Sequence, residues 1–182
     1  MYALGKVVTE LPAALSRRID PRAGVSLVWG RIAAGSAANA IPQVGEVEGT
    51  VRCLDLRAWQ EAPELIADLI QQVASTYGAD AEIGYHRGVP PVVNDPDCTA
   101  LLRTAGTMVL GSHAVVGTEQ SLGGEDFAWF LERVPGALVR LGVRAPGDTT
   151  RRDLHQGTFD GDEGAIPIGV KLFVATALLS YR

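Results

Sequence analysis

The side chains of this sequence best suited to bind a metal or move a proton are three histidines, His86, His113 and His155. His86 lies beside an arginine in a predicted strand, and His113 lies in a Gly-Ser turn. Both positions are typical of surface or structural histidines. His155 lies in the loop DLHQGTF between a predicted strand and a predicted buried helix, and loops at strand ends often carry functional sites. A catalytic zinc needs about three protein ligands, so one histidine does not make such a site.

Asn39 and Arg52 form a second set of candidates. Asn39 stands in a loop of small side chains, and Arg52 lies late in a predicted strand. An arginine and an amide at one site would suit a substrate carboxylate, because both form directed hydrogen bonds and the guanidinium adds charge. The alternative is a turn asparagine and an arginine that extends from a sheet into solvent.

The segment SLGGEDF brings Gly123, Gly124 and Glu125 together. Two glycines allow a tight turn or a close approach to a ligand, and acidic residues suit the first turn of a helix. A plain glycine turn before a helix is the alternative. The lysine and Ser/Thr of a phosphate-binding loop are absent from this segment, and the chain contains no Gly-x-Ser-x-Gly nucleophile motif.

The first half of the chain predicts the elements that position Asn39 and Arg52. Apolar residues from Leu4 to Leu15 recur at helical spacing, Pro12 is expected to kink or split that helix, and Asp20-Pro21 ends it. Strands are predicted at residues 25–32, 46–54 and 81–86, with a helix at 59–77 that ends at Gly78.

The order helix–strand–strand–helix–strand matches a ferredoxin-like unit without its first strand. That strand would precede Met1, and no capping residue precedes the opening helix. We therefore expect the chain to be the back portion of a longer protein.

The second half begins after a proline-rich hinge at residues 88–96. Asp95 or Asp97 is expected to cap a helix over residues 98–108. In chain order, the sequence then predicts a strand at 114–116, a helix at 125–133, a strand at 137–143, a polar loop at 144–157, and a helix from Asp162 or Glu163 to Leu179.

Composition excludes several classes of protein. The 182 residues are 47% hydrophobic, enough for a core, and their formal charge of −5 argues against a dedicated nucleic-acid or anionic-membrane binder. Two cysteines, Cys53 and Cys98, are too few for a disulfide scaffold or a cysteine-rich zinc module. No targeting segment opens the chain, and the longest apolar stretch is too short and interrupted to span a membrane. A cytoplasmic protein is expected.

Six motifs in order resemble the amidohydrolase branch of the peptidase M20 family, of the aminoacylase and hippurate-hydrolase type. Each motif alone is weak, but their common order over nearly the whole chain is specific. They are SRRIDP (16–21), NAIPQ with EGTVR (39–43 and 48–52), PPVVND (90–95), SLGGEDFAWF (121–130), PGALVRLG (135–142) and LHQGTFDGDE (154–163).

The resemblance implies an α/β fold class. Residues 1–88 would be a ferredoxin-like lid and dimerisation domain lacking its first strand, and residues 89–182 the C-terminal part of a zinc-peptidase-like catalytic domain. It implies that His155 is a metal ligand. It also implies that Asn39 and Arg52 bind the substrate's carboxylate or backbone, and that Gly123, Gly124 and Glu125 form the floor of the cleft.

The implied reaction is hydrolysis of N-acyl amino acids or related amides. In the family, zinc or a similar divalent metal pair polarises the carbonyl and activates a water, and a glutamate accepts its proton. The other metal-ligand motifs of the family and its Glu-Glu pair are absent from these 182 residues. We therefore expect a fragment that is inactive alone. The alternatives are one half of a split enzyme completed by an upstream segment, and a non-catalytic dimerisation or carboxylate-binding module.

Overall fold

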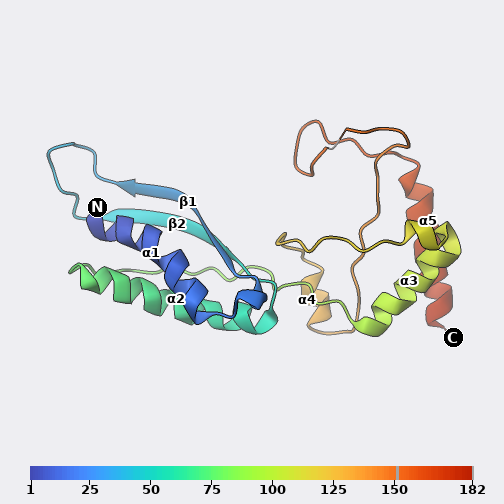
Figure 1. The fold of residues 1–182 in the computed structure, drawn as a ribbon, viewed down its shortest axis with the longest axis horizontal. Coiled ribbons are helices and arrows are strands. Elements are labelled where there is room, and N and C mark those ends of the chain that lie inside the picture. The colour runs from blue at the N-terminus through green and yellow to red at the C-terminus, as the bar shows by residue number, and fades with distance from the viewer. Residues whose placement is uncertain (151, 182) are drawn as a thin grey trace. The chain divides into compact units, whose positions relative to one another are not determined.

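A computed structural model describes residues 1–150 and 152–181 and divides the chain into two compact units. The first unit consists of Met1–Val92 and Ser121–Trp129, and the second of Val93–Gln120 and Phe130–Arg182. The segment Ser121–Trp129 therefore joins the N-terminal unit, although the sequence places it in the second half of the chain. Figure 1 shows the order of the elements.

The first unit is a two-stranded sheet with two helices packed on it (Figure 1). Its elements in chain order are α1 (Tyr2–Arg18), a 3-10 turn η1 (Pro21–Ala23), β1 (Ser26–Ala34), β2 (Gly45–Arg52) and α2 (Leu56–Thr76). The strands are antiparallel, and their register shifts between Trp29 and Arg31, where Gly30 has no partner. Such a bulge bends the strand and increases its twist. The predicted helices and both predicted hairpin strands are confirmed here, with boundaries moved by one to three residues.

The core of this unit lies where α1 meets α2. Its buried members are Leu11, Leu15, Ala62, Ile66 and Leu69, each at most 5% exposed. Side chains three or four positions apart share one face of a helix, which is why the apolar spacing of both segments produces this interface. Leu27, Trp29 and Val51 of the sheet pack against the cluster and remain half-buried.

Pro12 lies inside α1, and the helix continues through it. Of the two outcomes expected at Pro12, a kink or a split, the split is therefore wrong. A proline lacks the N–H that would bond the carbonyl four residues earlier, which here is that of Val8. The indole Nε1–H of Trp29 donates to the Val8 carbonyl oxygen at 3.0 Å. A side chain from β1 thus satisfies the backbone group that the proline leaves without its helical donor.

Side-chain caps fix the starts of two helices. The Asp55 carboxylate accepts from the Ala58 N–H at 2.8 Å at the start of α2. The Asp95 carboxylate accepts from the Cys98 N–H at 2.9 Å at the start of α3 (Pro96–Leu110), so Asp95 rather than Asp97 is the cap. At the other end of α2, Gly78 has φ +67, the left-handed region in which glycine is favoured.

Three predicted strands are not paired strands in the described parts of the chain. Residues 81–86 and 137–143 carry no ladder, and Ala114 belongs to the 3-10 turn η2 (Ser112–Ala114). A segment with strand-like composition becomes a strand only when a neighbouring edge bonds it. The fold is a mixed one of helices and a small sheet, whereas a complete ferredoxin-like sheet would need four paired strands.

The second unit contains α3, η2, the second half of α4 (Ala128–Leu131) and α5 (Ala165–Ser180). Helices α3 and α5 pack against each other. On α3, Gly106 lies close to Val115, which follows η2: an added Cβ would lie 3.1 Å from Val115 Cγ2. The Asn94 amide binds Leu138 twice at 2.9 Å, donating to its carbonyl and accepting from its N–H. Among the described residues, no helix has the length and apolar character needed to cross a membrane.

Trp29→Phe should lower the free energy of unfolding by about 1–3 kcal/mol, because it leaves the Val8 carbonyl without its donor. Pro12→Ala in the Trp29→Phe background should recover part of that loss, since residue 12 then supplies a helical N–H. Chemical unfolding followed by circular dichroism measures the double-mutant cycle. Strictly additive effects of the two substitutions would show that the indole does not compensate for the proline.

Candidate functional site

Arg52 ends β2, opposite Ser26 of β1, and reaches a segment far along the chain. Its Nη1–H donates to the Leu122 carbonyl oxygen at 2.7 Å, within the first unit. A hydrogen bond from a charged donor is stronger than one between neutral groups. This contact fixes the Ser121–Gly124 turn beside the end of the sheet.

The two glycines of that turn make different contacts. The Gly123 N–H donates to the Ser121 hydroxyl oxygen at 3.1 Å, which closes a local turn. At Gly124 an added Cβ would lie 3.0 Å from Val89 Cγ2, tighter than ordinary contact. The structure therefore brings Arg52, Gly123 and Gly124 together, three of the residues singled out from the sequence.

These residues line one end of a long groove in the first unit, with a volume of about 1220 Å³. One wall is β2, the other is the chain from residue 79 to 91, and the floor includes Ile66 and Ile70 of α2. Burial raises the pKa of the Tyr85 phenol, and the negative charge of a Cys53 thiolate adds to that rise. Burial likewise raises the pKa of the Cys53 thiol. Burial thus favours the neutral forms of Tyr85 and Cys53, whereas Arg52 at the end of the groove attracts negative charge.

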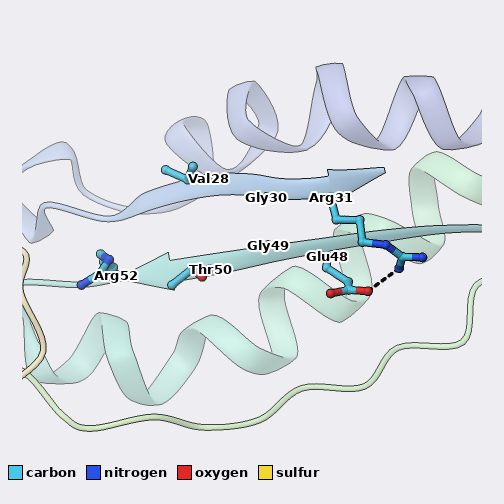
Figure 2. A pocket seen from close by; sticks show the side chains of 7 residues that line it. All are labelled: Val28, Gly30, Arg31, Glu48, Gly49, Thr50 and Arg52. Atoms are coloured by element: carbon cyan, nitrogen blue, oxygen red, sulfur yellow. Dashed lines mark hydrogen bonds and ion pairs between the residues drawn. The ribbon is translucent and has the colours of Figure 1, made fainter. Parts of the chain in front are cut away.

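A shallower hollow of about 480 Å³ lies on the strands themselves (Figure 2). At Gly30 an added Cβ would meet nothing within 4 Å, whereas at Gly49 it would lie 2.6 Å from the Trp29 ring. Arg31 forms ion pairs with Glu48, its cross-strand partner, and with Glu46 at 3.0 Å. One guanidinium balances only one of the two carboxylates, so this cluster keeps a net negative charge. Arg52 borders both this hollow and the groove.

Asn39 does not join Arg52. It lies exposed in the loop that connects β1 to β2, beyond the pair Ala34–Gly45, whereas Arg52 lies at the opposite end of the hairpin. The seven residue steps from Gly45 to Arg52 span about 24 Å. The amide and the guanidinium therefore do not meet within this chain, and the role of both residues in substrate binding stays a prediction.

Glu125 and His155 are both exposed. The Glu125 carbonyl accepts from the Ala128 N–H at 3.0 Å at the turn into α4, and the carboxylate does not line the groove. His155 belongs to the second unit and has φ +69, a strained backbone conformation for a residue other than glycine. Within residues 1–150 and 152–181, no three His, Cys, Asp or Glu side chains are grouped so that they could hold a metal ion.

An ion pair orders the loop that leads to His155. The Arg152 guanidinium donates to the Asp148 carboxylate at 2.5 Å, and the Thr150 N–H donates to the same carboxylate at 2.8 Å. Both donors favour the ionised form, so they lower the pKa of Asp148 from 3.8 to about 2.

Sequence reasoning missed an aromatic stack beside the groove. The Arg87 guanidinium lies 4.7 Å from the centre of the Trp59 ring, and Trp59 meets Trp129 edge-on with centroids 6.2 Å apart. Arg87 also donates to the Gln60 carbonyl at 3.1 Å, close to Pro63 inside α2. The stack helps to hold Ser121–Trp129 in the first unit. No local spacing could reveal it, because Trp59 and Trp129 lie far apart in the sequence.

The profile of the Peptidase family M20/M25/M40 matches residues 3–179. The chain belongs to this family. The identification agrees with the resemblance at the level of the family, while the branch within it remains a prediction.

Curated relatives include "Putative glutamate--cysteine ligase 2-3" of Rhodococcus jostii (strain RHA1), 47% identical over 98% of this chain but only 22% of that protein. "Probable hydrolase sll0100" of Synechocystis sp. is 38% identical over 93% of this chain and 44% of its own length. The N-acetylcysteine deacetylase of Bacillus subtilis (strain 168) is 32% identical over 97% of this chain and 45% of its own length. The chain spans less than half the length of each of these relatives.

A solved structure has the same fold. The YXEP protein of Bacillus subtilis, a dinuclear metal-binding peptidase of the M20 family, matches with a TM-score of 0.81 and 29% identity, over 99% of this chain and 46% of that protein. The structural match thus extends over nearly all of this chain and covers less than half of the peptidase.

Replacing Arg152 with Gln should raise the pKa of Asp148 from about 2 towards 3.8, because the hydrogen bond from the guanidinium that contributes most to lowering this pKa is lost. Carboxyl NMR titration measures it. The folded pKa lies below the unfolded one, so the ion pair stabilises the loop above about pH 4 and is lost as the pH falls through 2. Arg144→Gln, in the same polar loop, is the control. An unchanged Asp148 pKa in Arg152→Gln would contradict this assignment.

Proposed function

We propose that this chain forms part of a metal-dependent amidohydrolase that cleaves N-acyl amino acids, with Arg52 binding the carboxylate of the amino-acid half. The family membership and the deacetylase relatives support an amide substrate. The relatives named as deacetylases act, by their names, on N-acetylcysteine and N-acetyldiaminopimelate, which are both N-acyl amino acids.

The observation that carries this proposal is the position of Arg52. Its bond to Leu122 uses one of the five N–H donors of a guanidinium, and the residue stays exposed at the end of the groove beside Gly123 and Gly124. A forked carboxylate contact is the interaction that an arginine makes best. A glycine turn held next to that arginine allows a ligand to approach the backbone closely.

The metal of such an enzyme does not fit the described residues of this chain alone. A catalytic zinc takes three protein ligands, whereas His155 stands exposed with no metal-ligating cluster around it among those residues. We propose His155 as one ligand of a site completed by polypeptide outside this chain, and we derive no catalytic step from a metal here. In this proposal residues 1–88 form the lid and 89–182 part of the catalytic domain, and the chain alone is inactive.

A ligase function has weaker support than a hydrolase function. The relative named as a ligase is matched over 22% of its length, but the hydrolase and deacetylase over 44% and 45%. The second candidate worth testing is a carboxylate-binding module without catalysis. The exposed Arg52, together with the lack of a metal-binding cluster in the described residues, favours that candidate.

The chain should bind N-acetyl-L-cysteine weakly through Arg52. In Arg52→Gln the affinity should fall about tenfold or more, since one charged hydrogen-bonding contact is lost. NMR titration measures the dissociation constant, and the matching carboxamide, which lacks the carboxylate, should bind no better to the unaltered chain than to Arg52→Gln. Arg57→Gln, which removes an exposed arginine paired with Glu61 at 2.8 Å on α2, is the control. Equal binding by Arg52→Gln and the unaltered chain would exclude the carboxylate role.

The purified chain supplied with Zn²⁺ should release no cysteine from N-acetyl-L-cysteine above the rate without protein. A thiol-independent amine assay follows the released amino group. Turnover that disappears with a chelator and in His155→Ala would show that the chain assembles a working centre by itself, contrary to the proposal. Carboxylate binding without turnover agrees with both candidates. Adding polypeptide that supplies the rest of the relatives' length distinguishes them, because only part of an amidohydrolase should then gain turnover.

A further inference from the structure

The face of the hairpin that points away from the helices carries a row of three polar side chains on β2. Val51 packs against the helical core, and side chains alternate along a strand, so Glu48, Thr50 and Arg52 share the opposite face. All three are exposed and line the hollow of about 480 Å³ (Figure 2). That volume lies within the range of about 300–1,000 Å³ usual for small-molecule sites.

The two ends of this row carry opposite charges. Arg52 stands at one end, and four residue steps, about 13 Å between Cα atoms, separate it from Glu48. At the other end, Nη1 of Arg31 forms ion pairs with both Glu48 and Glu46, so two carboxylates share one guanidinium. Hydrogen bonds to Glu46 and to Glu48 raise the pKa of Arg31. The hollow therefore has a positive end and an end with a net negative charge.

The surface between the two ends is open and partly apolar. Val28 lies opposite Thr50 in the register of the strands, and 60% of its surface is exposed. At Gly30, two residues further along β1, an added Cβ would meet nothing within 4 Å. A chain of CH₂ groups can lie along such a surface while its charged end stays in water, as the stem of a lysine does.

We propose that Glu48 determines side-chain specificity, and that this hollow takes an N-acyl amino acid whose side chain ends in an ammonium or guanidinium group. The carboxylate lies at Arg52, the side-chain stem over Val28 and Thr50, and the cation beside Glu48. This inference rests on the proposed function, because it takes Arg52 as the carboxylate-binding residue. An acidic side chain would meet the net negative end of the hollow, and an apolar one would leave that charge unmatched.

The ion pair with Arg31 prepares Glu48 for this role. It uses Oε1 of Glu48 and fixes the position of the carboxylate over the sheet. A carboxylate has a second oxygen, which can accept from a ligand's N–H groups. A metal ion fits less well than an organic cation, since residues 1–150 and 152–181 contain no group of three His, Cys, Asp or Glu side chains that could hold one.

The test compares Nα-acetyl-L-lysine with Nα-acetyl-L-norleucine as ligands of the whole 182-residue chain. The two compounds share the acyl group, the carboxylate and a straight side chain, and only the first carries the terminal ammonium. NMR titration at low ionic strength should show that the lysine compound binds about two- to fivefold more tightly, the range expected for an exposed ion pair. Added salt should reduce this preference, because it screens exposed charges.

Two matched variants separate the local contact from the overall charge of the protein. In Glu48→Gln the preference for the lysine compound should disappear, while the affinity for the norleucine compound should stay within about twofold. Glu61→Gln is the control, since it also removes an exposed carboxylate that is paired with an arginine, Arg57 at 2.8 Å. Glu61 does not line the hollow, so this variant should keep the preference.

Two results would overturn the inference and leave the proposed function standing. One is equal affinity of the unaltered chain for the two compounds, with binding of both still weakened by Arg52→Gln. The other is the same loss of preference in Glu61→Gln as in Glu48→Gln, which would assign the preference to the net charge of the protein. Binding of the norleucine compound that does not change in Arg52→Gln would contradict the proposed function, and this inference with it.

Discussion

Extended backbone needs a hydrogen-bonding neighbour, and this requirement governs the first unit. Strand β1 meets it for one edge of β2, and the other edge of β2 faces residues 80–91 across a groove. The helices bury the inner face of the hairpin through Leu11, Leu15 and Ile66, but their packing supplies no partner for strand edges. Where a neighbouring strand exists the backbone pairs with it, and where none exists the same kind of sequence remains unpaired.

The area of exposed surface also points to contacts with other polypeptide. The chain exposes 13310 Å², whereas a folded monomer of its mass exposes about 8,400 Å². Even two separate domains of half the mass would expose only about 10,200 Å² together. Much of the excess is apolar: on α5, Ile166, Phe173 and Leu178 are each about two-thirds exposed or more. Surfaces of this kind in soluble proteins commonly mark contacts with other polypeptide.

Sequence reasoning succeeded where local physics decides the structure. Helix α2 follows from its apolar period, its Asp55 cap and Gly78, and the hairpin follows from two alternating segments joined by a loop. It failed at residues 81–86 and 137–143, since strand pairing depends on a neighbour that composition does not reveal. At Pro12 it missed the indole of Trp29, a donor from another element.

Of the candidate site residues, the structure brings some together and leaves others apart. Arg52 and Gly124, which the sequence analysis took from separate candidate sets, are brought together by the Leu122 bond and the approach to Val89. Asn39 has suitable chemistry but stands at the other end of the hairpin, because the register of β1 and β2 fixes the distance between them. The edge-to-face contact of Trp59 with Trp129 joins segments whose proximity no short motif encodes.

The most direct test of this account is a solution NMR measurement of cross-strand contacts between β2 and residues 80–91 in the chain alone. The account expects the nuclear Overhauser effects of the β1–β2 ladder and none of the interstrand Hα–H^N contacts between β2 and residues 80–91. A continuous set of such contacts, showing that β2 and residues 80–91 pair with each other, would contradict it.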